Sequence, residues 1–378
     1  MTKDASRAPV HEKDRSQQRR QRVFKGVAAA MVVCAMPVIG EAFLRLAAPQ
    51  PASWFDVYRR HPTLPFYALQ ADVDQTIDTG ETRWRLLTDG DGFRVSAPPE
   101  QRSRQAPARL GLVLGDSFAF AQGVDYEQGF VHRLERATPW RFRNASVPGY
   151  GPVQYRQLLS QALEQGERPA VILVSTFLGN DLHDCIWSKD IPVHDGVIGD
   201  RGDFKSRLKR SSHLYRLFAK AYHVVAPPPP VAGGAPLDAY APASYQPGGE
   251  MHRASALYRR EMTTIAALAR KHAIPLLVVV IPAPESVKAA RGELPKSGND
   301  YDLPRAFATS CLEALEIPFV DLTKVFERHP TDSVYFSHDG HLTPFGNQLV
   351  ASALTPKLPV ATPREEPLDP GARAGPPL

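Results

Sequence analysis

Cysteine is scarce in this chain: among 378 residues there are three, Cys34, Cys185 and Cys311. Their spacing matches no metal-binding pattern, and we expect neither a metal ion nor a cofactor. Cys34 lies in an apolar stretch near the amino terminus, which leaves Cys185–Cys311 as the one possible disulfide of the body. Outside the cytoplasm that bond is permitted, and two free thiols are equally compatible with the sequence.

The body of the chain also lacks a net charge. The whole sequence carries 45 Lys and Arg against 40 Asp and Glu. Eight of those basic residues and three of the acidic ones lie in residues 1–25, so residues 26–378 hold equal numbers of each sign. Because nucleic-acid binding needs a basic footprint, we expect no nucleic-acid partner for the body.

A long apolar run follows the basic tail. Residues 26–40 carry no charge, and residues 23–44 reach the roughly twenty residues that a membrane-spanning helix needs. We therefore expect a cytoplasmic tail over residues 1–22 and an uncleaved signal anchor over residues 23–44. The positive-inside rule then predicts a single pass through the inner (cytoplasmic) membrane with the body periplasmic. A cleaved signal peptide is the alternative, although Leu46 and Pro49 make cleavage after Ala48 unfavourable.

The remaining sequence divides into three segments. Residues 50–107, rich in Pro and charge, predict a small β-rich lead-in segment. Residues 109–357 alternate short apolar runs with amphipathic stretches, which predicts an α/β domain whose parallel sheet of about five strands is covered on both faces. An insertion at 186–250 is either a lid or wall of a site or a surface decoration. Residues 359–378 are Pro-rich and predicted to be disordered.

The alternation within 109–357 is regular enough to place its elements. The predicted strands are 110–114, 141–145, 170–176, 275–281 and 317–321, and the predicted helices are 125–137, 152–165, 253–272, 302–315 and 343–355.

The first of these strands runs directly into Gly115-Asp116-Ser117. A strand that ends in this way holds a serine hydroxyl at the carboxyl edge of a parallel sheet, where ligands of open α/β sheets bind. Taken alone, Ser117 is more simply a helix N-cap residue. Three further groups are predicted at the same edge: the turn that contains Gly149, Asn180 after the third strand, and Asp339-Gly340-His341 near the end of the domain.

These groups are the parts that acyl transfer through a covalent intermediate requires. Ser117 would be the nucleophile, and His341 the general base and then acid. Asp339 would orient the imidazole of His341. The backbone N–H groups of Ser117 and Gly149 and the side chain of Asn180 would form the oxyanion hole.

In this order, the four blocks resemble those of the SGNH (GDSL-type) hydrolase family, in its membrane-anchored bacterial branch. The resemblance implies a three-layer α/β/α flavodoxin-like sandwich over about residues 109–357. One departure is that the family commonly places its Asp three residues before the His, a position that His338 occupies here. The Asp-x-His spacing of Asp339 and His341 is similar to that of the polysaccharide O-acetyltransferase branch.

The resemblance implies a serine esterase that cleaves O-acyl, chiefly O-acetyl, esters outside the cytoplasm, on an envelope or exopolysaccharide glycan. An O-acetyltransferase with the same residues is the first alternative. A lysophospholipase or thioesterase is the second, and an inactive glycan-binding assembly protein is the alternative that is not an enzyme.

Overall fold

The computed structural model describes most of the chain, namely residues 10–50, 56–97, 109–187, 191–194, 196–198, 208, 211–225, 237–294 and 298–359. The predicted tail at 359–378 lies outside the described residues except for Pro359. The same holds for parts of the cytoplasmic tail, the lead-in segment and the insertion.

A five-stranded parallel sheet forms the centre of the fold, in the order β11-β10-β7-β5-β6. The predicted fold class is therefore confirmed. Its strands agree with the expected ranges to within two residues: they are β5 (Leu110–Leu114), β6 (Arg141–Asn144), β7 (Ile172–Phe177), β10 (Leu276–Ile281) and β11 (Phe319–Asp321).

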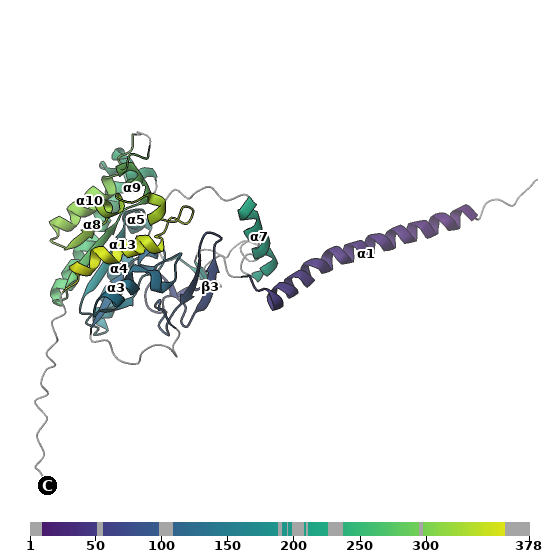
Figure 1. Cartoon of the computed structure of the whole chain (residues 1–378), viewed down its shortest axis with the longest axis horizontal. Coiled ribbons are helices and arrows are strands. Elements are labelled where there is room, and N and C mark those ends of the chain that lie inside the picture. Colours follow the sequence, from purple (N-terminus) through teal and green to yellow (C-terminus); the bar gives the residue numbers. More distant parts are fainter. Residues whose placement is uncertain are drawn as a thin grey trace, which may run out of the picture. The chain divides into compact units, whose positions relative to one another are not determined.

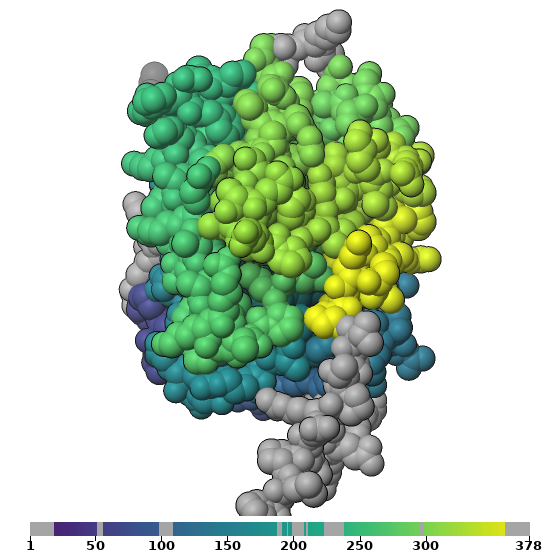
Figure 2. Space-filling view, turned by 90° about the vertical axis from the view of Figure 1, so that its left-hand side faces the viewer, coloured from purple at the N-terminus to yellow at the C-terminus, as the bar shows by residue number. Residues whose placement is uncertain are grey.

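Helices cover both faces of this sheet, and alternate residues of each strand point into separate cores. Ile172 and Val174 of β7 enter one core, whereas Leu173 enters the other, as the two-residue period of a strand requires. The first core packs against α4 (Pro152–Glu164), α5 (Asp181–Trp187), α8 (Glu250–Lys271) and α10 (Leu303–Ala314). Figure 2 shows the outer surface of that layer around α8 and α10.

The second core lies under shorter helices on the other face of the sheet. They are α2 (Ser117–Phe120), α3 (Phe130–Ala137), α9 (Pro284–Ala290), α11 (Thr323–Phe326), α12 (Thr331–Val334) and α13 (Pro344–Leu354). The described residues also form short 3-10 helices: η2 (Tyr126–Gln128), η3 (Leu237–Tyr240), η4 (Pro242–Tyr245) and η5 (Thr355–Lys357).

The lead-in segment contains two pairs of short strands. These are β1 (Tyr58–Arg60) with β2 (Tyr67–Leu69), and β3 (Asp74–Asp78) with β4 (Arg83–Leu87). Tyr58, Tyr67 and Trp84 join the first core, so this segment contributes to the packing of the α/β domain. In the insertion, β8 (Val193–His194) pairs with β9 (Val197–Ile198).

The amino-terminal helix α1 (Val10–Ala47) is continuous (Figure 1). Its stretch Arg19–Ala47 is long and apolar enough to cross a membrane, by length and composition. Only 6% of its most apolar window is buried, so it is not the core helix of a globular domain. The same test is passed by a signal sequence near the amino terminus.

The chain forms two compact units, which cut across the segments expected from the sequence. One consists of Met1–Trp54, Asp78–Gly80 and Arg201–Pro227 and therefore holds α1 together with α7 (His213–Val225) of the insertion. The other consists of Phe55–Ile77, Glu81–Asp200 and Pro228–Leu378 and holds the sheet. Cys185 and Cys311 are both buried free thiols in this structure.

Candidate active site

Ser117 lies where the strand β5 ends and the one-turn helix α2 begins. A Cβ at position 115 would come within 2.7 Å of the Cβ of Ala119, so only glycine allows this close turn. The carboxylate of Asp116 then accepts a hydrogen bond from the N–H of Phe118 at 2.9 Å and caps the helix. The backbone thereby delivers Ser117 to the carboxyl edge of the sheet, with 9% of its surface exposed.

Ser117, His341 and Asp339 lie together in a hydrogen-bonded row. The Oγ of Ser117 is 2.8 Å from the Nε2 of His341. The Nδ1 of the same ring is 3.1 Å from the Oδ2 of Asp339. Both His341 and Asp339 keep about a sixth of their side-chain surface exposed, at 16% and 18%, so the row reaches solvent. The structure thus brings the predicted nucleophile, base and acid into one geometry.

A tight turn explains how an acid only two residues before the histidine reaches its ring. Gly340 has φ +75°, a left-handed conformation that favours glycine. The N–H of Gly340 donates to the carbonyl of Phe336 at 3.0 Å, and the N–H of Phe336 donates to the carbonyl of His341 at 2.8 Å. This closed turn directs the side chains of Asp339 and His341 toward each other.

Glu81 supports the same turn from outside and is a residue that sequence reasoning missed. Its carboxylate accepts hydrogen bonds from the N–H of Asp339 at 2.7 Å and from that of His338 at 3.0 Å. Glu81 lies between β3 and β4, more than 250 positions earlier in the chain. His338, at the position where the family commonly has its acid, is held through its backbone. No local pattern in the sequence could have paired these residues.

Gly149 lies in the turn after β6, with φ +80°. A Cβ at this position would come within 2.5 Å of the Oη of Tyr67, so a larger residue would have to displace that ring. The same hydroxyl donates to the carbonyl of Pro148 at 2.9 Å and holds the turn. Among the residues that the structure describes, the N–H groups of Gly149 and Ser117 have no acceptor in the protein.

Asn180 follows β7, and its carboxamide is oriented by a neighbouring acid. Its Nδ2 donates to the Oδ2 of Asp184 at 2.9 Å, one helical turn further along. Because a carboxamide has two N–H donors, this bond sets the orientation of the side chain, and one N–H is not bonded to Asp184. The predicted donors of the oxyanion hole therefore come from the ends of three neighbouring strands of one sheet.

Three carboxyl groups lie around Asn180, and burial keeps their pKa values high. Burial raises the pKa of Asp184 to about 7, and the negative charge of Asp116 adds to the rise. Burial likewise raises the pKa of Asp116 to about 6, against the opposing effects of the Phe118 N–H and of His341. The pKa of Asp181, which is fully buried and near Asp116, lies well above its usual range.

Arg94, from the lead-in segment, holds the far end of the serine turn. Its guanidinium is buried and donates to the carbonyls of Ala121 at 2.6 Å, of Val124 at 2.7 Å and of Phe120. It also lies over the rings of Trp84 and Phe120, at 4.7 and 4.6 Å from their centroids. Burial lowers the pKa of Arg94 to about 9, which leaves it charged at neutral pH. The lead-in segment thus supplies hydrogen-bond donors to the carbonyls at and beyond the end of α2, which this one-turn helix cannot satisfy itself.

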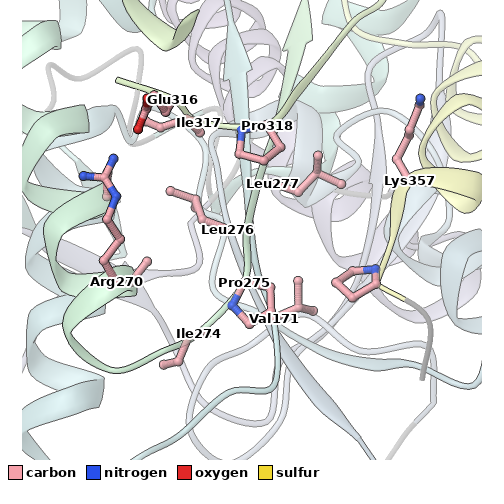
Figure 3. Close-up of a pocket in the computed structure, with 13 residues that line it drawn as sticks. Val171, Arg270, Ile274, Pro275, Leu276, Leu277, Glu316, Ile317, Pro318 and Lys357 are labelled. Carbon is pink, nitrogen blue, oxygen red and sulfur yellow. The ribbon is translucent and has the colours of Figure 1, made fainter. Parts of the chain in front are cut away.

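A separate cavity of about 280 Å³ lies at the opposite edge of the sheet, where β7, β10 and β11 begin (Figure 3). Val171, Leu276 and Pro318 line it, together with the charged side chains of Arg270 and Lys357. Ser117 is at the carboxyl edge, so this cavity is not part of the candidate active site.

A family model described as "SGNH hydrolase-like domain, acetyltransferase AlgX" matches residues 244–370. The matched segment contains Asp339 and His341 and begins after Ser117, Gly149 and Asn180. No curated protein matches the chain.

Solved structures to which this chain is similar include that of TesA, at 15% identity and a TM-score of 0.39. The match covers 66% of this chain and 98% of TesA. A lipase/acylhydrolase from Enterococcus faecalis has 13% identity and a TM-score of 0.37, covering 66% and 94%. A lipolytic protein of the G-D-S-L family from Veillonella parvula DSM 2008 has 11% identity and a TM-score of 0.39, covering 66% and 98%.

We predict that Arg94→Met strongly destabilises the protein. The substitution leaves the carbonyls of Phe120, Ala121 and Val124 without this donor, and an unsatisfied buried polar group costs roughly 1–3 kcal/mol. A total of about 3 kcal/mol lowers the Tm of a domain of this size by roughly 6–12 °C. Thermal unfolding of the full chain in detergent measures the shift. Arg85→Met, which removes an exposed ion pair with Asp74, is the control and should shift the Tm far less, because water and salt screen a surface pair. Equal shifts in the two variants would contradict this role of Arg94.

We predict that the native chain loses stability as the pH rises from 4 to 7.5 and that Asp184→Asn does not share this loss. The variant should therefore become more stable relative to the native chain across this window. The folded-state pKa of about 7 exceeds the ordinary value of 3.8, so the folded protein holds a proton that the unfolded chain releases. The native chain therefore loses stability across this window, by up to a few kcal/mol at 1.36 kcal/mol per pKa unit. Asn carries no charge to lose and can still accept the hydrogen bond from Asn180.

Urea unfolding at pH 4.5 and at pH 7.5 measures this difference. Asp332→Asn, at an exposed position, is the control for the loss of a surface carboxylate. If Asp184→Asn changes stability by the same amount at both pH values, Asp184 does not carry the buried proton.

Proposed function

We propose that this chain is a member of the SGNH hydrolase family and a serine esterase that cleaves O-acyl esters through a covalent acyl-serine intermediate. The observation that supports this function best is the row of hydrogen bonds from Ser117 through His341 to Asp339. A neutral serine is a weak nucleophile, and it needs a base at hydrogen-bond distance whose ring is oriented by a third group. The 2.8 Å distance between Ser117 and His341 and the 3.1 Å distance between His341 and Asp339 support both conditions.

In the first step, the Oγ of Ser117 attacks the carbonyl carbon of the ester while its proton passes to the Nε2 of His341. Asp339 accepts the hydrogen bond from the Nδ1–H and stabilises the imidazolium that forms. The tetrahedral intermediate then collapses. His341 gives the proton to the departing alcohol, and the acyl group remains on Ser117.

Negative charge develops on the former carbonyl oxygen during this step. The N–H groups of Ser117 and Gly149 and the second N–H of Asn180 are the donors we propose for it. Since α2 is a single turn, its dipole contributes little, and the individual N–H groups carry the stabilisation. Donors of this kind are each worth about 10²–10³ in turnover, because they are oriented before the charge forms.

In the second step, an incoming hydroxyl attacks the carbonyl carbon of the acyl-serine while His341 removes its proton. The bond between that carbon and the Oγ of Ser117 then breaks, and His341 returns the proton to the Oγ. Water gives hydrolysis, and a sugar hydroxyl gives O-acetyl transfer. The second outcome is supported by the family model, whose description names an acetyltransferase, and by the Asp-x-His spacing of Asp339 and His341. The residues of the first step serve both reactions equally.

We propose an acetylated glycan outside the cytoplasm as the substrate, with α1 as an uncleaved anchor. The apolar stretch Arg19–Ala47 supports the anchor. The acetyl group follows from the acetyltransferase named by the family model, and the glycan follows from the family resemblance.

We expect Ser117→Ala to abolish covalent labelling by a fluorophosphonate and to lower the hydrolysis of a chromogenic acetyl ester by orders of magnitude. His341→Ala should do the same, because it removes the base. Gel fluorescence measures the labelling and absorbance measures the turnover. Labelling of Ser117→Ala at the native level would contradict the assigned nucleophile.

Asp339→Ala and His338→Ala form a matched pair for that experiment, since they are neighbours in the same turn. Asp339→Ala should lower turnover strongly, because His341 loses its orienting acid. His338→Ala leaves the backbone bond to Glu81 in place and should retain most of the activity. The reverse order would make His338 the functional partner.

Partitioning of the acetyl group separates the two reactions. If the chain is a transferase, addition of an oligosaccharide acceptor should shift the product from acetate to acetylated sugar at a constant rate of ester cleavage. Mass spectrometry of the acceptor and an acetate assay give the ratio. Acetate as the sole product at every acceptor concentration would identify a hydrolase for that set of acceptors.

A further inference from the structure

The helix α7 (His213–Val225) directs its polar residues toward the compact unit to which it belongs. His213 accepts a hydrogen bond from the N–H of Gln50 at 2.8 Å, and Arg216 donates to the carbonyl of the same residue at 3.1 Å. Lys220 forms an ion pair with Asp78 at 2.6 Å. These positions are three and four residues apart, so they form one stripe along the helix.

The other side of α7 is apolar and exposed. Phe218 and Tyr222 expose 65% and 66% of their surface. They belong to the same helix whose basic residues are paired with protein groups. This is the reverse of a surface helix in water, which turns its apolar side inward. Large aromatic side chains exposed together are typical of a surface that contacts a membrane or another protein.

Glu41 attaches the start of α7 to the end of the apolar helix α1. Its carboxylate accepts hydrogen bonds from the N–H groups of His213 at 3.0 Å and Leu214 at 2.9 Å, and from the hydroxyl of Ser212 at 2.8 Å. These bonds satisfy backbone donors that a helix start leaves unpaired. Glu41 is two turns before the end of α1 at Ala47.

An apolar groove of about 650 Å³ lies between the two helices. Val38 and Ala42 of α1 and Leu214 and Phe218 of α7 are among its lining residues. On α1 itself, Val38, Ile39 and Phe43 expose more than 60% of their surface. The apolar surface of the membrane-spanning candidate therefore continues onto α7.

We propose that α7 is an interfacial helix that lies in the surface of the lipid bilayer beside the anchor, with Phe218 and Tyr222 among the acyl chains. A helix docked to the last turns of a spanning helix is at the level of the headgroups. The sequence before α7 supports a lipid partner, because residues 201–210 carry five basic residues and one acidic residue. Basic segments of this kind favour anionic lipid surfaces.

This inference rests on the proposed anchor, and it adds a second membrane contact that ties the insertion to the bilayer. The basic residues His213, Arg216 and Lys220 of α7 are bonded to other groups of the protein, so lipid contact comes from the apolar side of the helix. Two such contacts bind far more stably than one, because the second binds at high effective concentration.

The test uses the full chain in nanodiscs of phosphatidylcholine and phosphatidylglycerol. A nitroxide is placed by Phe218→Cys in a Cys34→Ser background, and its collisions with oxygen and with a water-soluble nickel chelate are measured. Thr263→Cys, at an exposed position of α8, is the aqueous control. A third sample carries the label on the native, exposed Cys34 of α1. We expect the oxygen-to-nickel accessibility ratio at 218 to exceed that at 263 several-fold.

The three labels separate the possible failures. If the label at 34 is in lipid and the label at 218 is as accessible to nickel as the one at 263, α7 is not interfacial and the anchor still stands. If the label at 34 also faces water, both the anchor and this inference fail. A label at 218 shielded from both reagents would mean that protein covers this side of α7, and it would overturn the proposal.

Discussion

The candidate site depends on one hydrogen bond between residues 224 positions apart, from Ser117 to His341. A parallel sheet makes this contact possible, because the carboxyl ends of all its strands meet at one edge. Ser117, the Gly149 turn and Asn180 follow three adjacent strands and therefore lie close together without any local signal. His341 reaches the same edge from the chain that follows β11. The sheet order is thus the constraint from which the chemistry follows.

The lead-in segment supports that edge from two directions. Glu81 holds the turn that carries Asp339, and Arg94 holds the carbonyls beyond α2. Tyr67 adds a third contact through the hydroxyl that packs against Gly149. These residues touch the elements that carry the proposed reacting groups, and none of them belongs to the predicted site. A segment of four short strands therefore acts as a brace for the serine turn, the glycine turn and the histidine turn.

Buried carboxyl groups are the cost of this arrangement. Asp116, Asp181 and Asp184 lie together behind Asn180 with raised pKa values, and ionising all three would be unfavourable. In return, Asp116 caps α2 and Asp184 orients the carboxamide of Asn180. The protein thus has unfavourably buried carboxyl groups next to the proposed donors of the oxyanion hole. Such a loss of stability is common where function requires a particular geometry.

By itself the sequence determined the parallel sheet and its strands, and it predicted the residues of the candidate site. Period-two and helical patterns are local; Gly115 and Asn180 follow recognisable strands, and His341 precedes a recognisable helix. Only the tertiary structure decided that Asp339 reaches His341, because this depends on the left-handed turn at Gly340. It also decided the roles of Glu81 and Arg94 and the reversed polarity of α7, because side-chain partners far apart in sequence leave no periodic trace. Secondary structure depends on neighbouring residues, whereas the pairing and orientation of side chains arise when distant segments pack together.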